Sequence, residues 1–419
     1  MQSLKISLYE ILLSLANAQD LALPEITLHH QQVANLALRI AQEAGLSLAD
    51  QKEIYIAALV HDIGALSMRE RFELIEGTAF NMYTHAVRGA KLLETFEPLK
   101  RVAELIRYHH TPWNKGRGAE DNGRKIEMGS HIIHLADRIC IKLKPGKNIL
   151  SQVPDLLAYL QEQSNKQFIP ELVELVLNVG RKEDFWLDIT NRLPGQEYYQ
   201  SNMRDYYFMS IEDLVQLSKI FSHIIDFRSK FTAKHSAGVA KTAERLAELV
   251  GFSPMECRMM LVAGYLHDLG KLAISDEVLE KPARLTIDEY NEIRAHTYYT
   301  YRLLEPIAEM KTINEWAAFH HEKLNGKGYP FHLAGNDIPL GARVMAVADV
   351  FTAVTESRPY RKSMPKEEII SVFENMVKSN GLDGRIVAIL LENFDELHTL
   401  CLVEQEKAGQ EYEEFLANT

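Results

Sequence analysis

Histidine and aspartate residues occur twice in this chain in the same order: a histidine, a His-Asp pair, another histidine, a double histidine and an aspartate. Imidazole nitrogens and carboxylate oxygens together suit borderline divalent ions such as Fe, Mn, Ni or Zn. A lone histidine is usually structural, so it is the repeated order that predicts metal chemistry. The first copy comprises His29, His61, Asp62, His85, His109, His110 and Asp137, and the second His235, His267, Asp268, His296, His320, His321 and Asp349.

The aspartate of each His-Asp pair can hold two ions at once, because a carboxylate has two oxygens. In the second copy we expect Asp268 to bridge two cations about 3.5–4 Å apart, the spacing of two-metal hydrolytic sites. A water held between them would lose its proton near neutral pH and act as a bridging hydroxide nucleophile. The expected ligands are His235, His267, Asp268 and Asp349 for one ion, and Asp268, His296, His320 and His321 for the other. The first copy keeps every equivalent ligand, so two more ions are expected there if its ligands assemble.

The second copy also has residues suited to phosphate. Lys271 follows its His-Asp pair, where the first copy has Ala65. Beyond Asp349 lie Arg358 and Arg361, and a lysine with two arginines near a metal pair would make a phosphate clamp. The loop after the double histidine offers Gly326 and Gly328 for close backbone approach and Tyr329 for stacking.

Six histidines have no counterpart in the other copy, so we interpret them as structural or surface residues. They are His30, His131, His134, His223, His332 and His398.

Helices must position these side chains. Apolar residues recur at three- and four-residue steps almost throughout, which predicts an all-α fold. The stretch from Leu28 to Ser47 resembles the stretch from Lys234 to Ser253, and the likeness continues through the metal-type residues. Such a long period indicates duplication of a whole domain. We therefore expect two tandem helical domains, 1–200 and 206–419, with a linker at 191–203 where Pro and Gly interrupt the pattern.

Composition narrows the function classes. A chain of 419 residues suits two domains, and its formal charge of −12 argues against binding DNA, RNA or an anionic membrane. No apolar run approaches the length needed to span a bilayer, and the N-terminus does not resemble a signal peptide. Three scattered cysteines, Cys140, Cys257 and Cys401, predict buried thiols in a reducing cytoplasm.

The second copy resembles the HD-GYP branch of the HD superfamily of phosphohydrolases over residues 210–400, through "HDLGK", "HHEKLNGKGYP" and "ADVFTAVTESRPYR". The resemblance implies a helical, metal-dependent phosphodiesterase that hydrolyses cyclic dinucleotides, cyclic di-GMP above all or cyclic GMP-AMP, to the linear dinucleotide. It implies catalytic roles for Asp268 and Lys271, since the lysine would hold phosphate. The other implied substrate-binding residues are Tyr329, Arg358 and Arg361, and the name-giving loop is Gly328, Tyr329 and Pro330. Family members with three metals have a glutamate where this chain has Phe231, so the resemblance supports two ions.

The first copy resembles a plain HD domain, because it lacks the lysine, the GYP loop and the arginine pair. It can be a second enzyme, a metal-filled regulatory module or a pseudo-symmetric support. Two alternatives for the whole chain stay open: a cyclic dinucleotide sensor or adaptor without turnover, and an HD phosphohydrolase of another nucleotide. The amphipathic leading helix is compatible with a homodimer, and the GYP loop could present a surface to signalling proteins.

Overall fold

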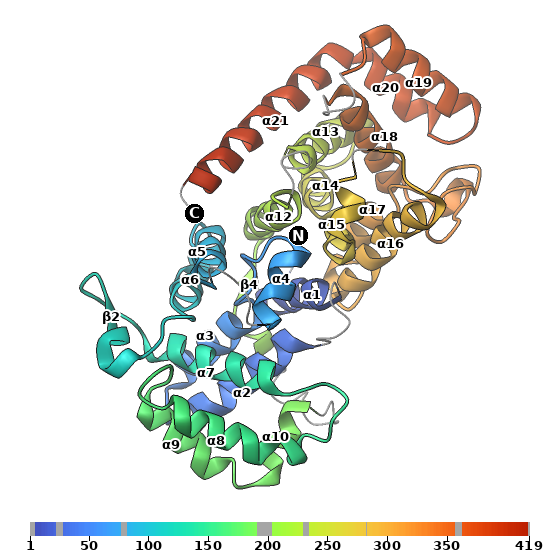
Figure 1. Cartoon of the computed structure of the whole chain (residues 1–419). Helices are drawn as coiled ribbons and strands as arrows, with labels where there is room; N and C mark the ends of the chain where they lie inside the picture. The colour runs from blue at the N-terminus through green and yellow to red at the C-terminus, as the bar shows by residue number, and fades with distance from the viewer. Residues whose placement is uncertain are drawn as a thin grey trace. The chain divides into compact units, whose positions relative to one another are not determined.

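The computed structural model describes residues 5–21, 28–76, 82–190, 203–228, 234–281, 283–356 and 363–417. Helices account for most of these residues, and each of the four strands among them has two residues. The prediction of an all-α fold is therefore confirmed. The chain divides into two compact units (Figure 1): one runs from Ser7 to Phe208, and the other comprises the residues from Met209 onward together with those up to Ile6.

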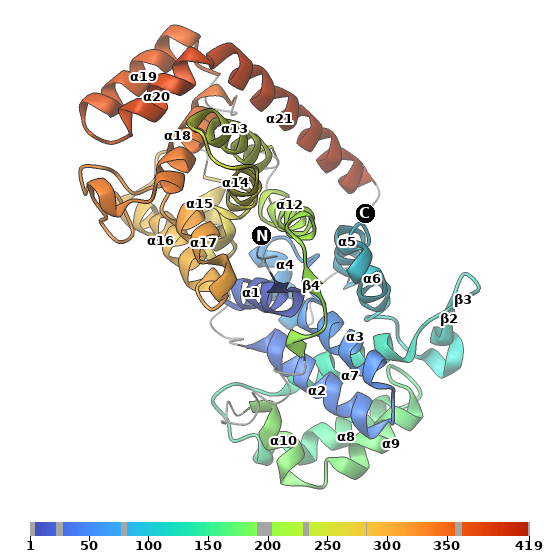
Figure 2. The same cartoon turned by 180° about the vertical axis from the view of Figure 1, so that it is seen from behind.

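The first unit contains ten α-helices among its described residues, seen from two sides in Figures 1 and 2. Short β1 (Ile6–Ser7) pairs with β4 (Phe208–Met209), and β2 (Glu120–Asp121) pairs with β3 (Arg124–Lys125). The helices are α1 (Leu8–Leu21), α2 (His29–Glu43), α3 (Leu48–Leu59), α4 (Met68–Glu76), α5 (Met82–Leu93), η2 (Glu97–Leu99), α6 (Lys100–Arg107), η3 (Asn114–Ala119), α7 (Met128–Lys142), η4 (Leu150–Gln152), α8 (Val153–Gln163), α9 (Pro170–Val179) and α10 (Glu183–Thr190).

The second unit repeats the order of the ligand-bearing helices and ends in a long helix, α21. Its helices are α12 (Ile211–Asp226), α13 (His235–Val250), α14 (Pro254–Leu266), η5 (Leu269–Ala273), α15 (Asp276–Leu279), α16 (Ile287–Leu304), η6 (Ala308–Met310), α17 (Lys311–Ala318), η7 (Gly335–Asp337), α18 (Leu340–Thr355), α19 (Lys366–Lys378), α20 (Gly384–Glu392) and α21 (Phe394–Ala417).

The repeated stretch of sequence forms the same local structure twice. In the second unit, α13 ends at Gly251, whose φ of 101° is a left-handed conformation that favours glycine. Ser253 then begins α14 with a capping box to Glu256 and with Pro254 in the first turn. In the first unit, the Ser47 side chain accepts a hydrogen bond from the Asp50 amide at the start of α3. A serine therefore caps the equivalent helix in both units, with a full capping box in the second.

The core of each unit is built around one central helix. In the first unit α2 packs against α3 and α7, and in the second α13 packs against α14 and α18. Their apolar stripes are buried, including Val33 and Ala37 in α2 and Val239 and Ala243 in α13. Full burial of one such valine side chain contributes roughly 1.5–3 kcal/mol. This packing fixes the helices from which the histidines and aspartates project.

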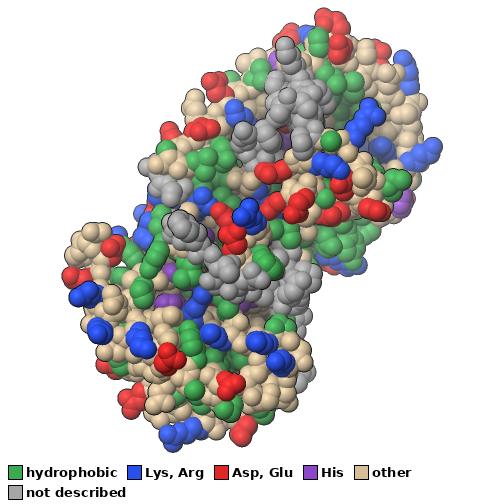
Figure 3. Space-filling model, in the orientation of Figure 1, with side chains coloured by type: hydrophobic (Ala, Val, Ile, Leu, Met, Phe, Trp, Pro, Cys, Tyr) green, Lys and Arg blue, Asp and Glu red, His purple; other side chains and the backbone are tan. Residues whose placement is uncertain are grey.

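The face of the molecule in Figure 3 carries charged side chains of both signs, with Lys and Arg side chains interspersed with Asp and Glu side chains. None of the helices formed by the described residues has the length and apolar character that a membrane span requires. The three cysteines carry free, buried thiols, as expected.

Candidate metal centres

Each His-Asp pair lies directly beyond the end of a helix. His61 and Asp62 follow α3, and His267 and Asp268 follow α14. Nδ1 of His61 contacts the Ala58 carbonyl oxygen at 2.8 Å, and Nδ1 of His267 makes the equivalent 2.8 Å contact three residues back along its own helix. With Nδ1–H donated to a carbonyl, Nε2 carries the lone pair that a metal needs.

The second unit brings its first predicted ligand group together. Nε2 of His235, at the start of α13, lies 3.2 Å from Oδ1 of Asp349 on α18. Nε2 of His267 lies 3.1 Å from Oδ2 of Asp268. The ligand atoms of His235, His267 and Asp268 all fall within 4.8 Å of one another. Three parts of the chain, the start of α13, the end of α14 and the middle of α18, therefore converge on one buried point.

The other oxygen of Asp268 faces the second predicted ligand group. Its Oδ1 lies 3.4 Å from Nε2 of His296 on α16, and that nitrogen lies 3.5 Å from Nε2 of His320. His296, His320 and His321 form a group whose ligand atoms are within 4.8 Å of one another. The two oxygens of Asp268 thus point at two different groups, which is the geometry a bridging ligand requires.

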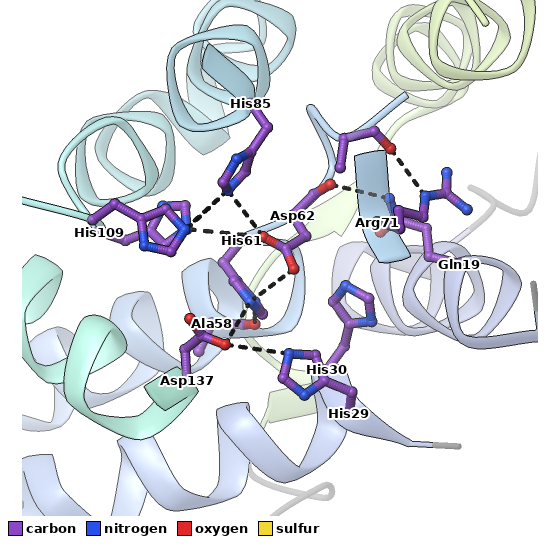
Figure 4. Close-up of polar contacts among 12 residues, drawn as sticks. Gln19, His29, His30, Ala58, His61, Asp62, Arg71, His85, His109 and Asp137 are labelled. Atoms are coloured by element: carbon purple, nitrogen blue, oxygen red, sulfur yellow. Dashed lines mark hydrogen bonds and ion pairs between the residues drawn. The ribbon is translucent and has the colours of Figure 1, made fainter. Parts of the chain in front are cut away.

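The first unit has the same arrangement (Figure 4). Oδ2 of Asp62 lies 3.2 Å from Nε2 of His61, and its Oδ1 lies 3.1 Å from Nε2 of His85. On the His61 side, Asp137 Oδ1 lies 3.4 Å from His29 Nε2. The remaining predicted ligands join the His85 side: His109 and His110 approach its Nε2 at 3.3 and 3.1 Å.

A glycine shared by both units holds the two ligand groups close together. A Cβ on Gly270 would lie 2.0 Å from the carbonyl oxygen of His296, and a Cβ on Gly64 would lie 2.0 Å from that of His85. The turn after the His-Asp pair can therefore touch the helix that carries the next histidine. These glycines were not predicted as site residues, although both stand two residues after an aligned aspartate.

The ionisation states of Asp268 and of the group formed by His296, His320 and His321 suit metal binding. His235 differs, because hydrogen bonds to Asp349 and Glu356 outweigh its burial and raise its pKa to about 10. Burial lowers the pKa of His296 to about 3, and burial also lowers the pKa of His320 and His321. Burial alone would raise the pKa of Asp268, but the charges of His267 and Lys271 hold that pKa well below its usual range. Neutral imidazole and ionised carboxylate are the forms that bind a metal.

The polar atoms left without partners also fit a bound cation. His61 Nε2 and Asp137 Oδ1 are buried and have no hydrogen-bond partner among the described residues. Buried polar atoms are normally satisfied, because leaving one bare costs about 1–3 kcal/mol. A divalent ion between them would satisfy both atoms, so the residues present fit the metal ions that the sequence predicts.

The predicted phosphate-binding residues are placed in part. Lys271 Nζ lies 2.5 Å from Oδ2 of Asp268, and the lysine side chain is about one-fifth exposed. The Tyr329 ring lies 4.9 Å from the His321 ring. Arg358 and Arg361 lie outside the described residues, as does Phe231.

The GYP loop is fixed by backbone contacts. A Cβ on Gly328 would lie 2.4 Å from Cα of Glu322, so only glycine fits there. The buried Glu322 carboxylate accepts hydrogen bonds from the amides of Phe331 and Leu333 at 2.7 and 3.0 Å. The Tyr329–Pro330 peptide bond is cis. Glu322, which the sequence analysis passed over, therefore anchors the loop beside His321.

Three other residues near the centres were not singled out from the sequence. Glu356, which is buried, lies 3.5 Å from Nδ1 of His235 and can orient that ring. The Arg294 guanidinium lies 5.0 Å from the centre of the Tyr329 ring, a cation–π distance. In the first unit, the Arg138 guanidinium pairs with Oδ2 of Asp137 at 2.6 Å. None of the three belongs to a pattern that both copies share, and a shared pattern is what identifies the ligands in the sequence.

Comparisons with known proteins agree with this duplication. The HD domain family matches residues 27–141, and a second HD domain family matches residues 219–386. A 3′3′-cGAMP-specific phosphodiesterase of Vibrio cholerae is 29% identical over 90% of this chain and 89% of its own length. A cyclic di-GMP phosphodiesterase response regulator of Xanthomonas campestris is 36% identical over 42% of this chain and 47% of its own length.

The fold likewise matches a solved structure. The crystal structure of a cyclic GMP-AMP-specific phosphodiesterase from V. cholerae superimposes with a TM-score of 0.64 and 23% identity, covering 93% of this chain and 98% of that one. This likeness concerns the fold, which the two chains share over nearly their whole length.

Proposed function

Because the chain belongs to the HD-domain family and carries one HD domain in each half, we propose that it is a metal-dependent phosphodiesterase. Its substrate is a cyclic dinucleotide, which it hydrolyses to the linear dinucleotide at the centre of the second unit. The observation that carries the proposal is the bridging position of Asp268 between two histidine groups, with Lys271 Nζ 2.5 Å from the same carboxylate. That combination suits phosphodiester hydrolysis.

The residues of the second unit divide the work. Two divalent ions bound by the histidines and aspartates would supply an activated water. Lys271 holds a positive charge beside Asp268, where it can attract a phosphate oxygen of the substrate. Tyr329 offers a ring face next to His321 on which a base can stack. Hydrolysis adds the water oxygen to phosphorus and breaks one P–O3′ bond, and the proton of the water ends on the departing 3′ oxygen.

The relatives favour 3′3′-cGAMP as the better substrate. The cGAMP-specific relative matches both halves of this chain, whereas the cyclic di-GMP relative matches over 42% of it. We therefore expect turnover of both dinucleotides, with the higher kcat/KM on 3′3′-cGAMP. The first unit lacks a lysine at the position of Lys271, since Ala65 stands there, so we assign it no part in this reaction.

The test is hydrolysis of 3′3′-cGAMP and cyclic di-GMP by the full chain, purified without chelator and followed by liquid chromatography of the products. We expect the linear dinucleotide, and we expect Asp268→Asn to lower its formation by about 10³-fold or more. The matched control is Asp62→Asn, which makes the same change in the first unit and should leave turnover intact.

Three outcomes would contradict the proposal. Tight binding of a cyclic dinucleotide by the fully metal-loaded chain without turnover would make the protein a sensor or adaptor. Hydrolysis of nucleoside triphosphates or cyclic mononucleotides in preference to both dinucleotides would make it a different HD phosphohydrolase. Loss of turnover with Asp62→Asn but not with Asp268→Asn would move the reaction to the first unit.

A further inference from the structure

His30 is a buried histidine beside the first unit's metal centre that the pairing of the two copies leaves unassigned. It follows His29 at the start of α2, and its side chain is about 4% exposed. Nδ1 of His30 contacts Oδ1 of the buried Asp20 on α1. Nε2 of His30 is buried and has no hydrogen-bond partner among the described residues.

The free nitrogen of His30 lies at the centre and not in an apolar core. Ligand atoms of His30, His61 and Asp62 all fall within 4.8 Å of one another. The His30 ring lies 5.3 Å from the His61 ring and 5.5 Å from the His29 ring. Figure 4 shows His30 next to the converging side chains of His29, His61 and Asp62.

The second unit keeps the aspartate at the equivalent position but has a serine in place of His30. Asp226 stands where the first unit has Asp20, and Ser236 stands where it has His30. The Ser236 hydroxyl donates to Oδ1 of Asp226 at 3.0 Å. The aspartate is thus common to both units. In the second unit it binds a serine hydroxyl, which is too short to reach the metal centre, and in the first unit it binds an imidazole.

The lysine of the second unit occupies the same neighbourhood. Lys271 Nζ lies 2.5 Å from Oδ2 of Asp268, the oxygen that also faces His267. The first unit has Ala65 at that position, and its own nearby cation, Arg138, pairs with Asp137 instead. Oδ2 of Asp62 is therefore not shared with a lysine, and His30 is the additional polar group near it.

We propose that His30, held by Asp20, is an additional nitrogen ligand of the ion that His29, His61, Asp62 and Asp137 hold in the first unit. That ion then has three imidazoles and two carboxylates, whereas its counterpart in the second unit has two imidazoles, two carboxylates and a lysine beside one carboxylate. An imidazole whose other nitrogen is bound to a carboxylate is a well-oriented and more basic ligand. The first unit should therefore retain this ion more tightly than the second unit retains the equivalent ion.

The experiment measures metal binding by the first unit, not catalysis, so it does not depend on the proposed phosphodiesterase activity. The chain carrying His267→Ala and His320→Ala serves as the parent, because it lacks ligands of both ions in the second unit. His30→Ser is introduced into it, a change that the second unit already accommodates as Ser236 beside Asp226. Zn²⁺ and Mn²⁺ content is measured by mass spectrometry after dialysis, and affinity is measured by competition with a chromophoric chelator.

We expect His30→Ser to lower the affinity of the parent chain for one of its two ions by about tenfold or more. Even changes outside the ligand shell commonly lower metal affinity about 10–100-fold. The second ion should keep its affinity. Ser236→Ala in the otherwise unaltered chain is the matched control and should change no metal affinity. The reverse exchange, Ser236→His together with Lys271→Ala, gives the second unit the residues of the first. It should raise the affinity of the second unit for one of its ions.

Unchanged affinity of both ions in a folded His30→Ser chain would overturn the proposal and leave His30 as a core residue paired with Asp20. If His30→Ser does not fold, His30→Gln replaces it, because the amide can keep a hydrogen bond to Asp20 but is a poor ligand. In that variant too, unchanged metal content would overturn the proposal. A His30 variant whose melting temperature falls equally with and without metal, and whose metal affinity is unchanged, would also overturn the proposal.

Discussion

Nζ of Lys271 lies 2.5 Å from Oδ2 of Asp268, and Nε2 of His267 lies 3.1 Å from the same oxygen. One carboxylate oxygen thus meets a lysine and a metal-type histidine together, while its partner oxygen faces His296. Under the proposed function, the lysine attracts a negatively charged substrate and is not itself a metal ligand. In the first unit Ala65 takes this place, so the two centres differ in charge beside a similar ligand set.

Replacing Lys271 should therefore separate catalysis from metal binding. We expect Lys271→Ala to lower kcat/KM for 3′3′-cGAMP by about 10²-fold, the usual cost of removing one group that stabilises transition-state charge. Metal content should stay unchanged, because the lysine is not a ligand. Steady-state kinetics and metal analysis on the same preparation check this. Loss of metal in step with activity would show that the lysine supports the centre instead.

Removing the bridging carboxylate should have a larger effect. Asp268→Asn should lower turnover by about 10³-fold or more, because an activated nucleophile at a metal centre is worth several kcal/mol. It should also lower the metal content of the chain. Asp62→Asn should lower the metal content to a similar extent while turnover persists, and equal loss of activity in both variants would mean that the two centres work together.

The glycine after each His-Asp pair should be required for its own centre. A methyl group on Gly270 would meet the His296 carbonyl oxygen, so Gly270→Ala must push apart the elements that carry the two ligand groups. Overpacking of this kind costs about 1–3 kcal/mol. We expect lower thermal stability, metal loss from the second unit and loss of turnover. Gly64→Ala should show the first two effects in its own unit and preserve turnover; unchanged metal content in both variants would refute this role.

The buried Asp226 should make stability depend on pH. Burial raises the pKa of Asp226 to about 7, although the charge of His235 opposes the shift. The folded-state pKa lies above the unfolded value, so the protonated carboxyl group stabilises the folded state. This contribution to the free energy of unfolding is fully present below about pH 4 and is lost as the pH rises toward 7. Asp226→Asn should remove this pH-dependent change in the free energy of unfolding, which amounts to up to about 4 kcal/mol.

The measurement for Asp226 is chemical unfolding from pH 4 to pH 7, with chelator present for both proteins. The stability difference between Asp226→Asn and the unaltered chain should grow across this range in favour of the variant. The exposed Asp395 provides the control substitution, Asp395→Asn. Parallel stability curves for the variant and the unaltered chain would contradict the prediction.

Arg294 should contribute to substrate binding through Tyr329. Its guanidinium lies over that ring at 5.0 Å, next to the GYP loop. We expect Arg294→Ala to raise the KM for 3′3′-cGAMP about 3–10-fold with little change in kcat, in keeping with a cation–π contact of about 1 kcal/mol. Arg302→Ala, on the same helix but over Tyr298, is the control. A fall in kcat with constant KM would contradict a role in binding.

The sequence by itself determined the fold class, the duplication and the identity of the paired residues. Helix periodicity and the Ser253 cap depend on local rules, so they can be recognised without the fold. The ligand candidates could be found because one order of histidines and aspartates occurs twice. Residues without a counterpart in the other copy, such as His30, Arg138 and Glu356, cannot be recognised from this repeated order.

The tertiary structure alone decided how those residues meet. Asp268 faces two histidine groups because α13, α14, α16 and α18 converge, and such convergence depends on packing between helices that are distant in sequence, such as α13 and α18. The contact of His30 with Asp20 likewise joins α1 to α2, and the approach of Gly270 to His296 joins a turn to a later helix. A sequence pattern can state which side chains are present, but distances between them arise only when the core is packed.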